Sequence, residues 1–129
     1  MKSVIFFVLI TLMVPSNIFG ADDPGIPRET KDKVQIAMQA HINGLLAKNG
    51  GSYPIFDPDI RNVVQLKFLE LHSGVVVKGS QGRYFISCAD FTDKENMTYD
   101  LDFLVSDNFE VVETLVHKKG GKKMHYGVH

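Results

Sequence analysis

Residues 30–49, TKDKVQIAMQAHINGLLAKN, decide the fold class, because they carry a clear helical repeat and the segments after them do not. Apolar side chains recur here with the i, i+3, i+4, i+7 spacing of one helix face. Thr30 can cap the first turn, and the Asn-Gly-Gly triplet at 49–51 tolerates the left-handed conformation in which many helices end. We therefore predict a helix over 30–49. Its apolar stripe consists of Val34, Ala37, Met38, His41, Ile42, Leu45 and Leu46.

Beyond the helix, the hydrophobic period changes to two, which is typical of β-strands. The strands predicted from these alternating runs span 62–77, 82–91, 97–106 and 109–119, with a short fifth segment at 124–128. We expect a bulge around Leu69–Ser73, and a loop at 52–59 because that segment holds two prolines. Short connections favour antiparallel neighbours. The prediction is an α+β fold with one N-terminal helix packed on a four- to five-stranded antiparallel meander sheet.

The N-terminal 20 residues have the pattern of a secretory signal peptide. Lys2 precedes an apolar run over Val4–Val14 that is too short to span a hydrocarbon core of about 30 Å. Small residues place the cleavage site after Gly20 or Ala21. We expect an exported protein, periplasmic or extracellular, with no stable membrane insertion after cleavage. An extended arm at 21–29 then precedes a single domain at 30–129.

Length and charge exclude several classes of protein. A chain of 129 residues allows one domain, and a net charge of −1 gives no bulk positive charge for binding nucleic acid. The single cysteine, Cys88, excludes an internal disulfide and a zinc site built from cysteines. Its neighbours Phe85 and Ile86 favour burial, and the place of His41 in the helix stripe favours a core histidine.

Acidic side chains are concentrated between Asp90 and Glu113, where the sequence holds eight carboxylates and a single basic residue, Lys94. Asp100 and Asp102 share one face of a predicted strand and could divide acid and base roles or hold Ca²⁺. Such a pair would suit a small-ligand enzyme. The preferred interpretation is a solvated sheet face.

Basic side chains and histidines gather at the C-terminus. A three-residue loop near Gly120 would set His117 opposite His125, and with His129 close behind they would suit Zn²⁺ or Cu²⁺. A two-residue loop would instead pair His117 with Met124 and turn His125 to the other face. The sequence leaves both registers open. No other cofactor is indicated.

A hairpin motif carries a family resemblance. The run Val75, Val76, Val77, Lys78 and Gly79, followed by Tyr84-Phe85-Ile86, resembles the Gln-x-Val-x-Gly hairpin and following strand of cystatins. Val77 and Gly79 match that motif and Val75 takes the place of the glutamine, while Gly25 resembles the family's N-terminal glycine. The resemblance covers about 25–118. It implies one long helix wrapped by an antiparallel sheet.

The same resemblance implies a function. In inhibitory cystatins, the glycine and hairpin enter the cleft of a papain-like cysteine protease. The family's Pro-Trp loop is replaced by 106–108, since the chain has no tryptophan. We therefore expect an exported, non-enzymatic, cystatin-like protein-binding module that contacts its partner through Gly25 and 75–79. The alternatives are an inhibitor of papain-like proteases, a metal-binding protein that uses its histidine-rich tail, and a small-ligand enzyme. That enzyme would resemble the cone-shaped α+β fold of nuclear transport factor 2 and ketosteroid isomerase, with Asp100 or Asp102 as its base.

Overall fold

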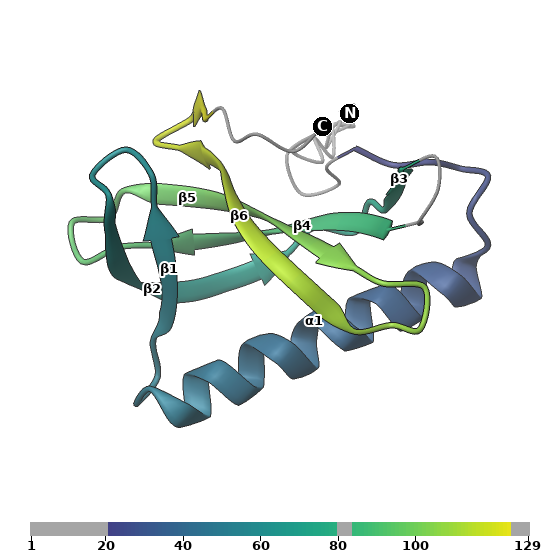
Figure 1. Cartoon of the computed structure of the whole chain (residues 1–129), viewed down its shortest axis with the longest axis horizontal. Coiled ribbons are helices and arrows are strands. Elements are labelled where there is room, and N and C mark those ends of the chain that lie inside the picture. The colour runs from purple at the N-terminus through teal and green to yellow at the C-terminus, as the bar shows by residue number, and fades with distance from the viewer. Residues whose placement is uncertain (1–20, 80–83, 125–129) are drawn as a thin grey trace, which may run out of the picture.

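The computed structural model describes residues 21–79 and 84–124 and has the predicted α+β architecture. One helix, α1 (Arg28–Lys48), lies across one face of a curled antiparallel sheet (Figure 1). The strands are β1 (Tyr53–Asp57), β2 (Asn62–Leu71), β3 (Val76–Lys78), β4 (Tyr84–Thr92), β5 (Thr98–Val105), β6 (Val111–Lys119) and β7 (Lys122–Lys123). They follow the order β1-β2-β4-β5-β6-β7, and β3 pairs with β4 beside the end of β2.

The predicted helix is present with shifted ends. It begins at Arg28, with Pro27 as its N-cap, so the prediction that Thr30 caps it is wrong. Proline needs no N–H at this end, where the first amides have no partner within the helix. The helix ends as expected: the Asn49 side chain donates to the Leu45 carbonyl at 2.9 Å, and the two glycines at 50–51 have φ values of 67° and 98°.

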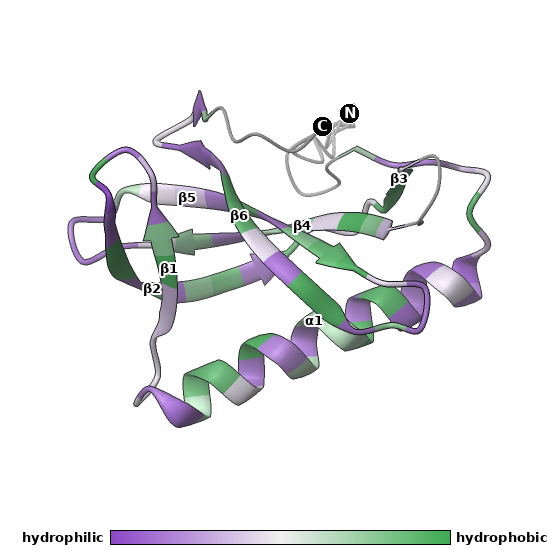
Figure 2. Cartoon of the chain, viewed as in Figure 1, coloured by the Kyte–Doolittle hydropathy of each residue, from purple (hydrophilic) through white to green (hydrophobic). Residues whose placement is uncertain are grey.

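The core lies between α1 and the sheet. Val34, Met38 and Ile42 are fully buried on the helix face that meets the strands, as the stripe predicted. They pack with a group of aromatic rings in which Phe91 and Phe103 are also fully buried. Figure 2 shows hydrophobic and hydrophilic residues alternating along α1 and the long strands. Burial of such a stripe is the main stabilising term for a domain of this size.

Two predictions about the first half of the sheet need correction. Residues 52–59 are not simply a loop, because they contain β1. Pro54 is tolerated there since β1 begins the strand order and its backbone pairs with β2 alone among the described strands. The predicted strand 62–77 is divided into β2 and β3, with a bulge between Phe68 and Glu70 near the expected place. With β7, these changes raise the number of strands to seven.

The curl of the sheet brings β1 against β6. The Tyr53 hydroxyl donates to Thr114 Oγ1 at 3.0 Å. Lys119 Nζ lies 2.8 Å from Oδ2 of Asp57, which is fully buried and also accepts a 2.8 Å hydrogen bond from the Tyr99 hydroxyl. The predicted solvated basic tail is therefore wrong for Lys119, whose ammonium holds two distant strands together.

No helix among the described residues combines the length and hydropathy that a membrane span requires. The predicted signal peptide at 1–20 lies outside the described residues.

Candidate functional site

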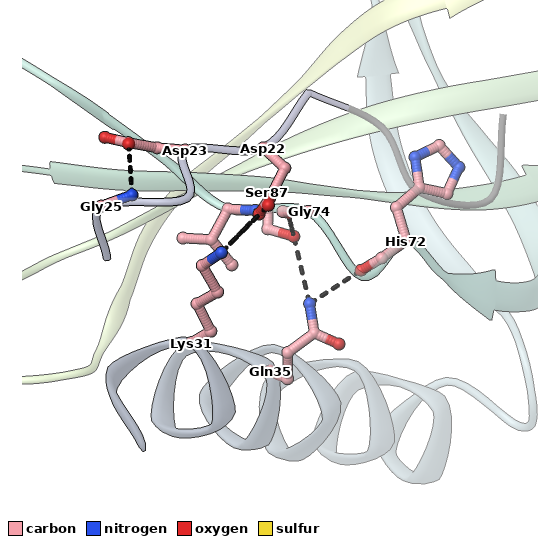
Figure 3. A network of polar contacts seen from close by, with 9 residues as sticks. Asp22, Asp23, Gly25, Lys31, Gln35, His72, Gly74 and Ser87 are labelled. Carbon is pink, nitrogen blue, oxygen red and sulfur yellow. Dashed lines mark hydrogen bonds and ion pairs between the residues drawn. The ribbon is translucent and has the colours of Figure 1, made fainter. Parts of the chain in front are cut away.

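The two segments of the predicted contact edge lie side by side. The Asp23 amide donates to the Val75 carbonyl at 2.9 Å, and the Val75 amide donates to Asp22 Oδ1 at 3.1 Å. Lys31 of α1 holds the same Asp22 carboxylate at 2.9 Å. This contact lowers the pKa of Asp22, and the Val75 amide acts in the same direction. The arm that carries Gly25 is thus tied to the start of β3 (Figure 3).

Exposure differs sharply among the predicted contact residues. Val75 is fully buried in the core, and Val76 is half-buried. Val77 is 40% exposed, and Lys78 and Gly79 are exposed as well. The surface of this edge is therefore formed by 77–79 together with Gly25, and Val75 supports it from below.

The turn at 106–110 lies at the same end of the sheet. Val77 pairs with Phe85, which pairs with Val105, which in turn pairs with Val111. One row of residues thus runs across four strands at the end of the sheet where the 106–110 turn joins β5 to β6. The arm, the end of β3 and the 106–110 turn consequently form one end of the molecule.

The break between β2 and β3 is held from the helix side. Gln35 Nε2 donates to the His72 carbonyl at 2.7 Å and to Ser87 Oγ at 3.2 Å, and Ser87 donates to the Gly74 carbonyl at 2.6 Å. In Figure 3 the ring of His72 points away from α1 while its carbonyl points toward Gln35. The break therefore fixes this ring on the sheet face opposite the helix.

That opposite face carries a group of metal-ligating and titratable side chains, which we term the outer-face cluster. Its members come from the end of β2 and from β4, β5 and β6. They are His72, Cys88, Asp90, Asp100, Asp102 and His117.

Strand register assembles most of this cluster. Cys88 stands opposite Asp102, and Asp90 stands opposite Asp100, across the β4–β5 pair. The Cys88 thiol donates to Asp102 Oδ1 at 2.9 Å. His72 Nε2 lies 2.9 Å from Asp90 Oδ1, and its backbone amide pairs with the Cys88 carbonyl.

A bulge on β6 adds His117 to the cluster. Asp100 pairs with Lys118 and Leu101 pairs with Val116, so His117 is the extra residue between them. Its Nδ1 lies 3.4 Å from Asp102 Oδ1 and 3.7 Å from Asp100 Oδ2. One imidazole nitrogen thereby faces two carboxylates.

The prediction that Asp100 and Asp102 lie on a solvated face is wrong. Asp102 is buried and Asp100 is mostly buried, and the strand that carries them, β5, is paired on both sides by β4 and β6. Burial raises the pKa of Asp100, although His72 and His117 act in the opposite direction. Burial also raises the pKa of the Cys88 thiol strongly, and the two neighbouring carboxylates add to the effect. Cys88 is therefore a protonated thiol at neutral pH and unsuited to act as a free nucleophile.

The C-terminal hairpin has the two-residue register. Lys119 pairs with Lys122, and the Met124 amide donates to the His117 carbonyl at 2.8 Å. Gly120 and Gly121 both have positive φ, as a tight two-residue turn of type I′ requires. His117 thus faces the two aspartates, whereas His125 and His129 lie outside the described residues. The three-histidine metal site remains a prediction.

His41 is the core histidine that its position in the stripe indicated. Its Nε2 lies 2.9 Å from the Tyr53 hydroxyl, and its ring meets Phe103 edge-on. Burial lowers the pKa of His41, so the ring is neutral at pH 7.

Sequence reasoning missed the grouping of His72 and Asp90 with the other members. The alternation that puts residues 88 and 90 on one face of β4, and 100 and 102 on one face of β5, was visible. Because these strands form a hairpin, a shared face could have been inferred from it. His72 gave no such signal, since the alternation fails just before it.

No protein-family model matches the chain, and no curated protein or solved structure was found to be similar to it.

Proposed function

We propose that the chain is an exported, non-enzymatic protein-binding module with a cystatin-like fold. The order of elements supports this proposal, because one long helix precedes an antiparallel meander whose first long hairpin carries the Val77 and Gly79 motif. β1 adds one strand to that meander by pairing with β2. A protein is the expected partner, and papain-like proteases are the first class to test.

The observation that carries the proposal is the bonding of the arm to β3. Asp22 and Asp23 each make one hydrogen bond with Val75, so Gly25 and the β3 hairpin form one continuous edge. Two segments about 50 positions apart in the chain, which the resemblance assigns to one contact surface, are therefore neighbours. A single partner cleft could receive both.

The chemistry of β3 suits a protein ligand. Among the described strands, β3 pairs with β4 alone. The arm bonds the opposite side of this segment at Val75, and beyond that point the edge can accept a partner strand through backbone hydrogen bonds. Val77 and Tyr84, each 40% exposed and on the paired strands β3 and β4, offer apolar contacts there. Lys78 is exposed, and its charge can discriminate among partners.

The packing of the core supports binding over catalysis. A cone-shaped enzyme would need a concave cavity between helix and sheet. Here the helix residues that face the sheet, Val34, Met38 and Ile42, are fully buried against aromatic rings. The proposal accordingly places function on the surface of the edge.

The edge can be tested by comparing two substitutions of matched chemistry. Val77→Asp places a charge on the proposed edge, and Val63→Asp places one on a valine of β2, 53% exposed, away from that edge. Proteins from the exported fraction of the native host are captured on the immobilised variants and quantified by mass spectrometry. We expect a partner that the wild type and Val63→Asp retain and that Val77→Asp loses by at least tenfold. A captured set that responds to neither substitution would contradict the edge.

A titration against papain separates the module from a true inhibitor. A missing interface aromatic commonly costs about 2 kcal/mol, which corresponds to roughly thirtyfold in affinity. Since the chain has no tryptophan and Val75 replaces the motif's glutamine, we expect weak inhibition or none. Nanomolar inhibition would establish the alternative function.

Export is tested at the N-terminus. Protein recovered from its native host should begin at Ala21 or Asp22. Retention of Met1 in the mature protein would contradict the proposal.

A further inference from the structure

We propose that Cys88, Asp100, Asp102 and His117 bind one divalent transition-metal ion of the Zn²⁺ class. Each residue offers one ligand atom, and the four atoms lie within 4.8 Å of one another. The site lies on the sheet face opposite α1 and is independent of the β3 edge. It also differs from the site predicted for the histidine-rich tail, because His117 turns toward the aspartates of β5.

The donor set fits a tetrahedral ion. One sulfur, one imidazole nitrogen and two carboxylates are ligands that Zn²⁺ accepts, whereas Ca²⁺ and Mg²⁺ prefer oxygen alone. Ligand bonds of about 2.0–2.3 Å in tetrahedral geometry separate neighbouring ligand atoms by roughly 3.5 Å. The separations of 3.4 Å from Asp102 to His117 and 3.7 Å from His117 to Asp100 lie close to that value. The 2.9 Å from Cys88 Sγ to Asp102 Oδ1 is the length of their hydrogen bond, which a bound ion would replace.

Buried polar atoms in the cluster give a second, independent argument. Asp100 Oδ1, His117 Nδ1 and both ring nitrogens of His72 are buried without a hydrogen-bond partner among the described residues. The His72 side chain is only 4% exposed, and its short contact with Asp90 lacks the angle of a hydrogen bond. Buried donors and acceptors are almost always satisfied in proteins. Several unsatisfied atoms around one point therefore indicate a ligand at that point.

The pair His72–Asp90 is placed to position one ligand of the ion. The ligand atoms of His72, Asp90 and Asp100 also lie within 4.8 Å of one another. The His72 imidazole would hold the Asp100 carboxylate in its orientation, as partners behind metal ligands commonly do. Asp100 therefore belongs both to the proposed ligand set and to the group that it forms with His72 and Asp90, and the two groups make one site.

Charge balance favours the same conclusion. Three carboxylates and a thiol are packed on one face, with two imidazoles as their partners within the cluster. A divalent ion would offset the negative charge. On binding, the Sγ–metal bond forms while the thiol proton, now donated to Asp102, is released to water. His117 is 28% exposed and Asp100 17%, which leaves an entry path from solvent.

The test uses the full chain, freed of metal with a chelator and titrated with Co²⁺ without oxygen. We expect one equivalent to bind and a thiolate-to-cobalt charge-transfer band to appear in the near ultraviolet. Cys88→Ser should abolish that band. Asp100→Asn and His117→Gln should weaken binding by more than about 100-fold, and His72→Gln by about 10- to 100-fold as a positioning residue.

Controls separate this site from other sources of binding. Asp107→Asn removes an exposed carboxylate outside the cluster and should leave the affinity unchanged. Circular dichroism of each apo variant reports folding, and Cys88→Ser, which is nearly isosteric, decides the matter if Asp100→Asn fails to fold. The proposal is overturned if Co²⁺ does not bind, if it binds without the band, or if Cys88→Ser keeps full affinity. Loss of binding only in a His125→Ala, His129→Ala double variant would likewise overturn it, in favour of the tail. Val77→Asp should bind Co²⁺ with wild-type affinity. The metal site and the protein-binding edge can therefore be refuted independently of each other.

Discussion

Replacing Lys119 by methionine should destabilise the protein by about 3 kcal/mol. Lys119 Nζ lies 2.8 Å from the carboxylate of Asp57, which is fully buried. Methionine keeps much of the apolar stem but removes the ammonium, so a buried charge loses its only cationic partner among the described ion pairs. Breaking such a pair from one side costs about 3–5 kcal/mol. We take the lower value because Lys119 is partly exposed and Tyr99 still donates to Asp57.

Urea unfolding measures this loss. With a slope of about 1.5 kcal/mol per molar, a loss of about 3 kcal/mol lowers the midpoint by about 2 M. Asp59→Asn is the matched control, because Asp59 binds the same ammonium at 3.0 Å but is 60% exposed. Its loss should cost less than about 1 kcal/mol. A Lys119→Met midpoint no lower than that of Asp59→Asn would refute the reasoning.

The pH dependence gives the same prediction a second readout. Burial alone would raise the pKa of Asp57, but hydrogen bonds from Lys119, the Asp59 amide and Tyr99 outweigh it and lower the pKa. The resulting stabilisation is present above the unfolded value of about 3.9 and is lost as pH falls through the folded-state pKa. Without the ammonium, Asp57 takes up a proton more readily. The deficit of Lys119→Met should therefore shrink in acid.

Three further outcomes follow from polar contacts and turns. Tyr53→Phe should lower the free energy of unfolding by about 1–3 kcal/mol, because the hydroxyl is hydrogen-bonded to both His41 and Thr114. Thermal unfolding measures the loss, and an unchanged melting temperature would contradict this. Burial lowers the pKa of His41, so the free energy of unfolding of the wild type should fall as pH drops below about 6.5. In His41→Gln, urea unfolding at a series of pH values should show a smaller decrease in the free energy of unfolding over that range. Gly120→Ala should cost about 1–2 kcal/mol through its φ of 60°, with little added by Met97, whose exposed side chain can move aside; equal unfolding midpoints for variant and wild type would count against it.

The helix and the later strands were predictable because their packing follows from local periodicity. Val34, Met38 and Ile42 recur on one helix face, and Leu101 and Phe103 alternate with polar neighbours on β5. β1 was missed because prolines usually interrupt strands, and only tertiary context shows that Pro54 lies in a strand paired on one side. The register of the last hairpin could have been predicted from its glycine pair, since Gly-Gly suits a two-residue turn.

The outer-face cluster was less accessible to sequence reasoning. Asp100 and Asp102 were recognised as a pair, but their burial depends on which strands flank β5 and in what register. His117 reaches them only through a bulge, and a one-residue shift would have turned it to the other face. His72 enters through the break after β2, where alternation carries no information about direction. Such placements depend on long-range pairing.

The contact between β1 and β6 also bears on the order of events during folding. Tyr53 and Thr114 lie 61 positions apart, and closing a loop of that length costs roughly 3.6 kcal/mol of chain entropy beyond a constant. Helix α1 and the β4–β5 hairpin join near neighbours in the chain and face no comparable barrier. We expect this closure to come after the transition state. Variants that remove the Tyr53–Thr114 contact should then unfold faster while refolding at nearly the wild-type rate. The contact would therefore slow the unfolding of the native state without speeding its formation.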